Sequence, residues 1–108
     1  MTDWHRVGAE QELRDRGASA IQIEGREIAV FWTTSGFRAV DDSCPHAGGP
    51  LSTGIACPER GTVECLWHGW SFDLATGDCR TAPTQKLGTH EVRTNDGQVE
   101  VRLRLVDS

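Results

Sequence analysis

The sequence contains no long apolar run, which excludes a membrane-spanning helix. The longest uninterrupted run, Ile28 to Trp32, has five residues, whereas a spanning helix needs about 20. The segment Met1 to Gly8 is polar and has no apolar stretch, so we expect no secretory signal. These two absences predict a cytoplasmic protein that does not associate with membranes.

Basic residues are in the minority. The chain has 11 Lys and Arg against 16 Asp and Glu, a net charge of -5, which argues against nucleic acid as a partner. It also has no G-x-G-x-x-G dinucleotide motif and no phosphate loop, and its 4 histidines leave too few for a mononuclear iron triad beside the sites described below. At 108 residues we expect a single domain, and nothing demands more than a monomer.

Both ends of the chain predict antiparallel β-structure. In the last strand Val99, Val101, Leu103 and Leu105 share one face. The polar stretch 9–16 predicts one helical turn or a loop. The predicted strands cover 20–24, 28–34, 37–40, 88–93 and 98–105, with turns at Gly25-Arg26, Ser35-Gly36 and Asn95-Asp96-Gly97.

The middle segment, Ser43 to Thr84, has a different composition. It holds all 4 cysteines, all 4 prolines and half of the 12 glycines, so it predicts loops, with short strands at 62–66 and 71–74. We therefore expect residues 1–42 and 85–108 to form a β-sandwich or barrel base. Residues 43–84 then form an inserted subdomain that carries the chemistry.

Two short motifs in this segment each combine a thiolate with an imidazole. Cys44-Pro45-His46 is C-x-H, Cys65-Leu66-Trp67-His68 is C-x-x-H, and 18 residues separate His46 from Cys65. Each loop therefore offers one soft and one borderline metal ligand. The glycines that follow each pair allow the backbone to approach a compact cofactor closely.

The pattern C-P-H-A-G-G-P-L followed by C-L-W-H-G-W-S-F-D closely resembles the Rieske [2Fe-2S] family over nearly the whole chain. The resemblance implies one [2Fe-2S] cluster per chain, with Cys44 and Cys65 on one iron and His46 and His68 on the other. It also implies an all-β fold whose inserted loops bind the cluster. The spacing between the motifs is slightly longer than in many ferredoxin-type members, and we expect the extra residues to extend the loop near 56–61. A third, proline-containing loop is expected at Ala82-Pro83-Thr84.

The resemblance also bears on the reduction potential. With two imidazole ligands the oxidised cluster is neutral, so it accepts an electron more easily than a four-thiolate cluster, which already carries negative charge. High-potential respiratory members have a serine and a tyrosine that donate hydrogen bonds to sulfur, at the positions of Trp70 and Phe72 here. They also have a disulfide, at the positions of Gly49 and Trp67. None of these groups is present, so we predict a low potential, below about 0 mV and near ~-150 mV.

The implied function is that of a Rieske-type ferredoxin, which is an electron carrier and not itself an enzyme. It would take single electrons from an NAD(P)H-dependent flavoprotein reductase and pass them to a terminal oxygenase, such as a ring-hydroxylating dioxygenase, docked over the two histidines. A second hypothesis is a stable small subunit of a larger reductase, as in assimilatory nitrite reductase. A more remote alternative is a structural zinc module, since zinc also accepts two thiolates and two imidazoles.

For the remaining candidate residues the sequence predicts less specific roles. Cys57 and Cys79 are either free thiols or a disulfide, which spacing alone cannot decide. His5 and His90 are expected to be ordinary surface or half-buried histidines, and Trp4 and Trp32 to belong to the core. Trp67 and Trp70 either shield the cluster or form a docking rim. The acidic residues near the loops are expected to be solvated, with docking of a basic partner as the alternative: Asp41, Asp42, Glu59 and Glu64.

Overall fold

Strands dominate the structure, a computed structural model that describes residues 3–43, 50–66, 69–80 and 86–104. One short α-helix and one turn of 3-10 helix interrupt them. The elements within these ranges are β1 (Trp4–Ala9), α1 (Glu10–Arg16), β2 (Ala18–Ile23), β3 (Arg26–Thr33), β4 (Gly36–Asp41), η1 (Leu51–Thr53), β5 (Ile55–Cys57), β6 (Thr62–Glu64), β7 (Ser71–Asp73), β8 (Thr89–Asn95) and β9 (Gln98–Arg102).

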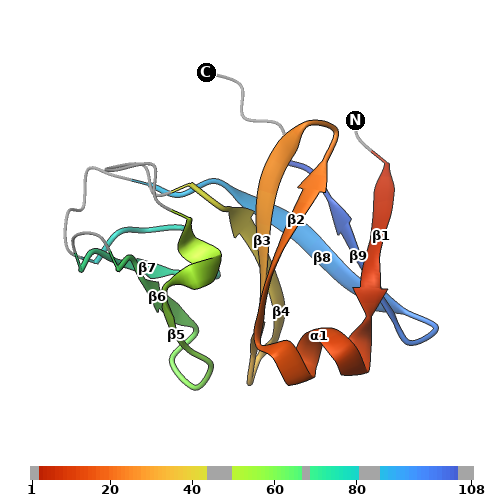
Figure 1. Cartoon of the computed structure of the whole chain (residues 1–108), viewed down its shortest axis with the longest axis horizontal. Helices are drawn as coiled ribbons and strands as arrows, with labels where there is room; N and C mark the ends of the chain where they lie inside the picture. Colours follow the sequence, from red (N-terminus) through yellow and green to blue (C-terminus); the bar gives the residue numbers. More distant parts are fainter. Residues whose placement is uncertain (1–2, 44–49, 67–68, 81–85, 105–108) are drawn as a thin grey trace.

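Six strands form one antiparallel sheet in the order β1-β9-β8-β4-β3-β2. Helix α1 joins the two edge strands β1 and β2, so the sheet curls into a nearly closed barrel (Figure 1). Leu13 anchors α1 on the barrel, because it is the buried residue of that helix. The predicted all-β fold is confirmed, and the stretch predicted as a helical turn or a loop is helical.

The β8–β9 hairpin matches its prediction closely. Asp96 and Gly97 have φ of 50° and 75°, which suits the tight turn between paired Asn95 and Gln98. Val99 and Val101 are fully buried, as the alternation requires, while Leu105 lies outside the described residues. The β2–β3 turn is at Glu24-Gly25, with φ of 49° and 80°, one residue earlier than predicted.

Strand β3 is buried on both faces and separates two hydrophobic clusters. Ile28 and Val30 face the barrel interior and pack with residues such as Val101. Ala29 and Phe31 point the other way and belong to the second cluster, because successive side chains of a strand alternate. This explains why β3 carries the longest apolar run of the chain.

The second cluster joins the barrel to a three-stranded antiparallel sheet of order β5-β6-β7, which lies beside β3 and β4 (Figure 1). Strands β6 and β7 were predicted. Strand β5 was not: the expected loop extension near residues 56–61 is wrong in part, because Ile55 to Cys57 pair with Thr62 to Glu64.

The expectation that Trp4 and Trp32 are core residues is also wrong. Both are only partly buried, and arginines cover their rings. The guanidinium carbons of Arg93 and Arg102 lie 4.1 and 4.8 Å from the centre of the Trp4 ring. Cation–π contacts of this kind let a large aromatic residue remain at the surface.

Candidate functional site

The segment that contains the first motif is closed at its base by backbone and side-chain hydrogen bonds. Ser43 and Pro50 form an antiparallel bridge, and the Leu51 N–H donates to the Asp42 carbonyl at 2.8 Å. The buried Asp42 carboxylate accepts the Ser52 backbone N–H at 2.7 Å and the Ser52 Oγ–H at 3.0 Å. Residues 44–49, with Cys44 and His46, lie outside the described residues.

The second motif begins at Cys65, directly after β6. Its side chain is 1% exposed and its thiol is free. The Cys65 N–H donates to the Trp70 carbonyl at 2.8 Å, and the Gly69 N–H donates to the Cys65 carbonyl at 2.8 Å. Gly69 has φ of 70°, a left-handed conformation that glycine adopts without cost. His68 lies outside the described residues.

A close backbone approach brings the first segment against the second. A Cβ atom on Gly54 would lie 2.3 Å from the carbonyl oxygen of Glu64, so only glycine permits this contact. Gly54 follows η1, which leaves the first segment, and Glu64 immediately precedes Cys65. The two segments that carry the motifs therefore meet at their bases, although 18 residues separate His46 from Cys65 in the sequence.

The predicted third loop is closed in the same manner. Bridges join Phe72 to Cys79 and Asp78 to Lys86, and the Arg80 N–H donates to the Ser71 carbonyl at 2.7 Å. Residues 81–85, which include Ala82-Pro83-Thr84, lie outside the described residues. Their two flanks are nevertheless held together by these contacts.

Residues at the bases of all three segments belong to one hydrophobic cluster. It contains a residue next to each of them: Leu51, Cys65, Cys79 and Leu87. The described bases of the three segments therefore share one hydrophobic cluster. Of the four predicted ligands the structure describes Cys65 alone. Its thiol is free and buried, and it lies in the hydrophobic cluster that the bases of all three segments share, which fits a ligand of an iron–sulfur cluster.

The two other described cysteines, Cys57 and Cys79, are not joined by a disulfide. Cys79 is buried and Cys57 is partly buried. This contradicts the alternative of a Cys57–Cys79 disulfide.

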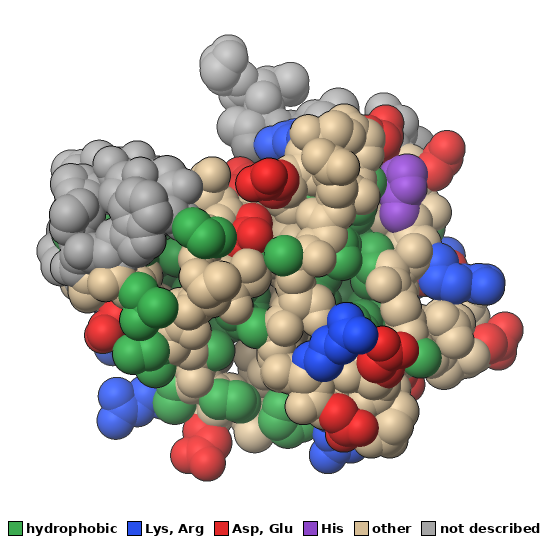
Figure 2. Space-filling view, in the orientation of Figure 1, with side chains coloured by type: hydrophobic (Ala, Val, Ile, Leu, Met, Phe, Trp, Pro, Cys, Tyr) green, Lys and Arg blue, Asp and Glu red, His purple; other side chains and the backbone are tan. Residues whose placement is uncertain are grey.

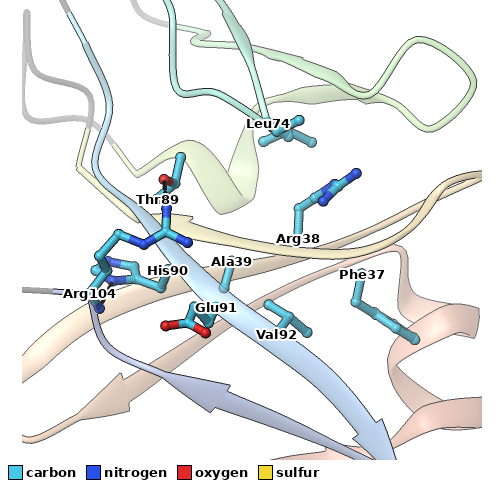
Figure 3. A pocket seen from close by; sticks show the side chains of 10 residues that line it. Phe37, Arg38, Ala39, Leu74, Thr89, His90, Glu91, Val92 and Arg104 are labelled. Carbon is cyan, nitrogen blue, oxygen red and sulfur yellow. Dashed lines mark hydrogen bonds between the residues drawn. The ribbon is translucent and has the colours of Figure 1, made fainter. Parts of the chain in front are cut away.

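The prediction that His90 is an ordinary surface or half-buried residue is wrong. Its side chain is 1% exposed, and Nδ1 accepts the Arg104 backbone N–H at 3.0 Å. A backbone N–H can only donate, so the ring proton is on Nε2, which donates to Asp41 Oδ1 at 2.8 Å. Figure 3 shows His90 beside Arg104, in a pocket of about 250 Å³ that Leu74 lines from the side of the small sheet.

Asp41 and Asp42 are likewise not the solvated charges that the sequence suggested. Asp41 joins β4 to β8 through His90, and its Oδ1 lies 3.7 Å from Arg26. Asp42 is 4% exposed and closes the first segment. Sequence reasoning missed this role because Asp42 and Ser52 are ten residues apart and only the folded loop brings them together.

Comparison with known proteins places this architecture in a family. The Rieske [2Fe-2S] domain family matches residues 3–99. The ferredoxin subunit of anthranilate 1,2-dioxygenase from Burkholderia cepacia is 35% identical over 104 residues, which cover 95% of this chain and 94% of that one. The chain belongs to the Rieske [2Fe-2S] family.

Two solved structures share the fold. One, described as a complex of reduced oxygenase and oxidised ferredoxin in carbazole 1,9a-dioxygenase, contains a chain with a TM-score of 0.86 and 26% identity, with 99% of this chain and 100% of that chain covered. The other, a proposed small subunit of an NADPH nitrite reductase, has a TM-score of 0.81 and 26% identity, with 92% and 97% covered.

Other relatives are much longer. The chain spans 24% of the 4β-methylsterol monooxygenase of Methylococcus capsulatus, with 38% identity over 91 residues.

The family and these ferredoxin relatives identify the chain as an electron-transfer protein with a [2Fe-2S] cluster, a component of an oxidoreductase system and not its catalytic enzyme. No helix among the described residues is long and apolar enough to cross a membrane.

Proposed function

We propose that Cys44, His46, Cys65 and His68 hold the cluster, two thiolates on one iron and two imidazoles on the other. The support is the burial of the Cys65 thiol and the convergence of three segments on one hydrophobic cluster. When bound, a cluster of this type accepts and releases one electron at a time. We keep the division into a base (1–42 and 85–108) and a cluster-binding subdomain (43–84) as part of this proposal.

The described residues serve the cluster in two ways: they fix the ligand segments and they exclude water. The hydrogen bonds that the Asp42 carboxylate accepts, and those around Cys65, fix the bases of the ligand segments. Leu51, Phe72 and Leu74 pack in the same cluster as Cys65 and keep water away from its sulfur. A ligand shell held in this way needs little rearrangement when the charge of the centre changes.

The partners we propose are an NAD(P)H-dependent flavoprotein reductase as donor and a terminal oxygenase as acceptor, with this chain as a monomeric carrier in the cytoplasm. The observation that carries this proposal is the end-to-end match to the ferredoxin subunit of anthranilate 1,2-dioxygenase.

Substitution of this chain for the ferredoxin subunit of that dioxygenase tests the proposal. NADH, the system's reductase and oxygenase, anthranilate and this chain are combined, and product formation is measured. We expect product only when the chain is present, and none with Cys65→Ser or His68→Ala, while Cys57→Ser supports turnover. A wild-type protein that has its cluster but supports no turnover contradicts the assignment of partners.

A second candidate function is a stable small subunit of a nitrite reductase, favoured by the 26% identical structure of that type. The two functions differ in how the protein behaves when expressed from its own genome. A carrier elutes alone on gel filtration, whereas a subunit elutes with its large partner.

A further inference from the structure

Two large hydrophobic side chains are exposed at the small sheet, one in β5 and one just after β6. Ile55 is 59% exposed and Leu66 is 57% exposed. Ile55 pairs with Glu64 across β5 and β6, and Leu66 follows two residues after Glu64. Val63 and Cys65 are buried, whereas Glu64, the last residue of β6, is exposed, and Leu66 lies in the turn that follows the strand. We call Ile55, Glu64 and Leu66 the β5–β6 patch.

The surroundings of the patch are apolar as well. Figure 2 shows hydrophobic side chains gathered at the surface over the region of η1, β5 and β6. Within the described ranges Glu64 forms no ion pair. Exposed apolar groups around an unpaired charge are typical of a surface that becomes buried in a complex, since a partner can cover the apolar area and neutralise the charge.

The patch is also close to the proposed redox centre along the chain. Cys65, a proposed ligand, lies between Glu64 and Leu66 and faces inward from the same backbone. A protein that covers the patch is therefore brought beside the ligand segments, as electron transfer over a short distance requires.

We propose that the β5–β6 patch is a docking surface for the electron-accepting oxygenase, which presents an apolar contact edged by Lys or Arg. This inference rests on the proposed function and adds the residues and the partner chemistry. The charge of Glu64 favours such a partner over a second copy of this chain. A two-fold symmetric contact centred here places Glu64 near its own equivalent, and each copy has a net charge of -5.

The test measures electron transfer from the reduced protein to two purified oxygenases, those of the anthranilate 1,2-dioxygenase and carbazole 1,9a-dioxygenase systems, by anaerobic stopped-flow mixing. We expect Ile55→Ser and Leu66→Ser each to lower the second-order rate constant about fivefold or more, as for the loss of a central apolar contact. We expect Glu64→Lys to lower it about tenfold at low salt. This variant also removes the decrease in rate that the wild type shows between ~20 mM and ~300 mM salt.

Three controls separate docking from damage to the centre. Ile55→Val keeps the apolar contact and retains the wild-type rate. Asp3→Lys makes the same charge change at the start of β1, on the opposite side of the barrel from the small sheet (Figure 1), and keeps the wild-type salt dependence. Ile55 lies on a strand without a proposed ligand, so Ile55→Ser also keeps the iron content, the EPR spectrum and the rate with the small oxidant ferricyanide.

The outcomes are distinguishable. If the wild type reduces an oxygenase and all three patch variants do so equally well, the docking surface is wrong and the proposed function stands. If the variants slow reduction by the reductase alone, the occupant is the donor and the proposal for the acceptor is wrong. If the wild type transfers electrons to neither oxygenase, the proposed function fails and this inference fails with it.

Discussion

The Asp42 carboxylate accepts two hydrogen bonds from Ser52, one from the backbone N–H at 2.7 Å and one from the Oγ–H at 3.0 Å. Asp42 is 4% exposed, so water cannot replace these bonds if the carboxylate is removed. The pair joins the residue before Ser43 to the residue after Leu51, and thereby closes the segment that carries Cys44 and His46.

We therefore predict that Asp42→Ala lowers the free energy of unfolding by about 1–3 kcal/mol, the cost of leaving buried donors unpaired, and lowers the iron retained per chain. Ser52→Ala, which keeps the backbone N–H bond, has a smaller effect on both. Urea unfolding and iron analysis measure the two quantities. If Asp42→Ala unfolds at the same urea concentration as the wild type, this role of Asp42 is wrong.

His90 leads to a second prediction, which concerns the barrel. Replacement by Leu leaves the Asp41 carboxylate without its donor and the Arg104 N–H without its acceptor. We expect a loss of about 2 kcal/mol or more in the free energy of unfolding. The matched control is His5→Ala, because the His5 side chain is 35% exposed and its ring nitrogen pairs with the exposed Glu24. Its effect is expected to remain within about 0.5 kcal/mol, and equal losses for the two variants contradict the assignment.

The ion pair between Glu91 and Arg102 leads to a prediction about acid stability. The side-chain hydrogen bond from Arg102 holds the pKa of Glu91 below its ordinary value of 4.5. A lowered pKa in the folded state means that the pair stabilises the protein above the unfolded pKa, and that this stabilisation is lost as the pH falls through the folded pKa. We expect Glu91→Gln to be slightly less stable than the wild type at neutral pH and equally stable in acid. Chemical unfolding at both pH values checks this, and a difference that does not change with pH argues against it.

The reduction potential tests the inference that Trp70 and Phe72 stand where high-potential members have hydroxyl groups that donate to sulfur. Phe72 is fully buried and offers no hydroxyl to sulfur, so we expect a midpoint below about 0 mV, near ~-150 mV. A redox titration followed by circular dichroism measures it. A strongly positive midpoint would show that other donors to sulfur replace the missing hydroxyls.

The sequence was sufficient where the pattern was local. The alternation of Val99, Val101 and Leu103 and the Asn95-Asp96-Gly97 turn predicted the last hairpin, and the two Cys–His motifs indicated the family. Strand β5 was missed because Gly54 precedes it and Pro58 follows it, and both residue types are typical of loops. The roles of Asp42 and His90 were missed for a different reason: their partners Ser52, Asp41 and Arg104 are distant in the chain. Only the folded structure shows that hydrogen bonds to these partners compensate for the burial of the two side chains.

The ligand set that we propose is two imidazoles and two thiolates on a pair of irons. The most direct measurement is pulsed EPR of the dithionite-reduced protein labelled with ¹⁵N-histidine. This ligand set predicts a signal with an average g value below that of the free electron and hyperfine couplings from two histidine nitrogens, one of which disappears in His46→Ala or His68→Ala. A reduced protein with no EPR signal, or with an iron–sulfur signal that lacks histidine couplings, contradicts it.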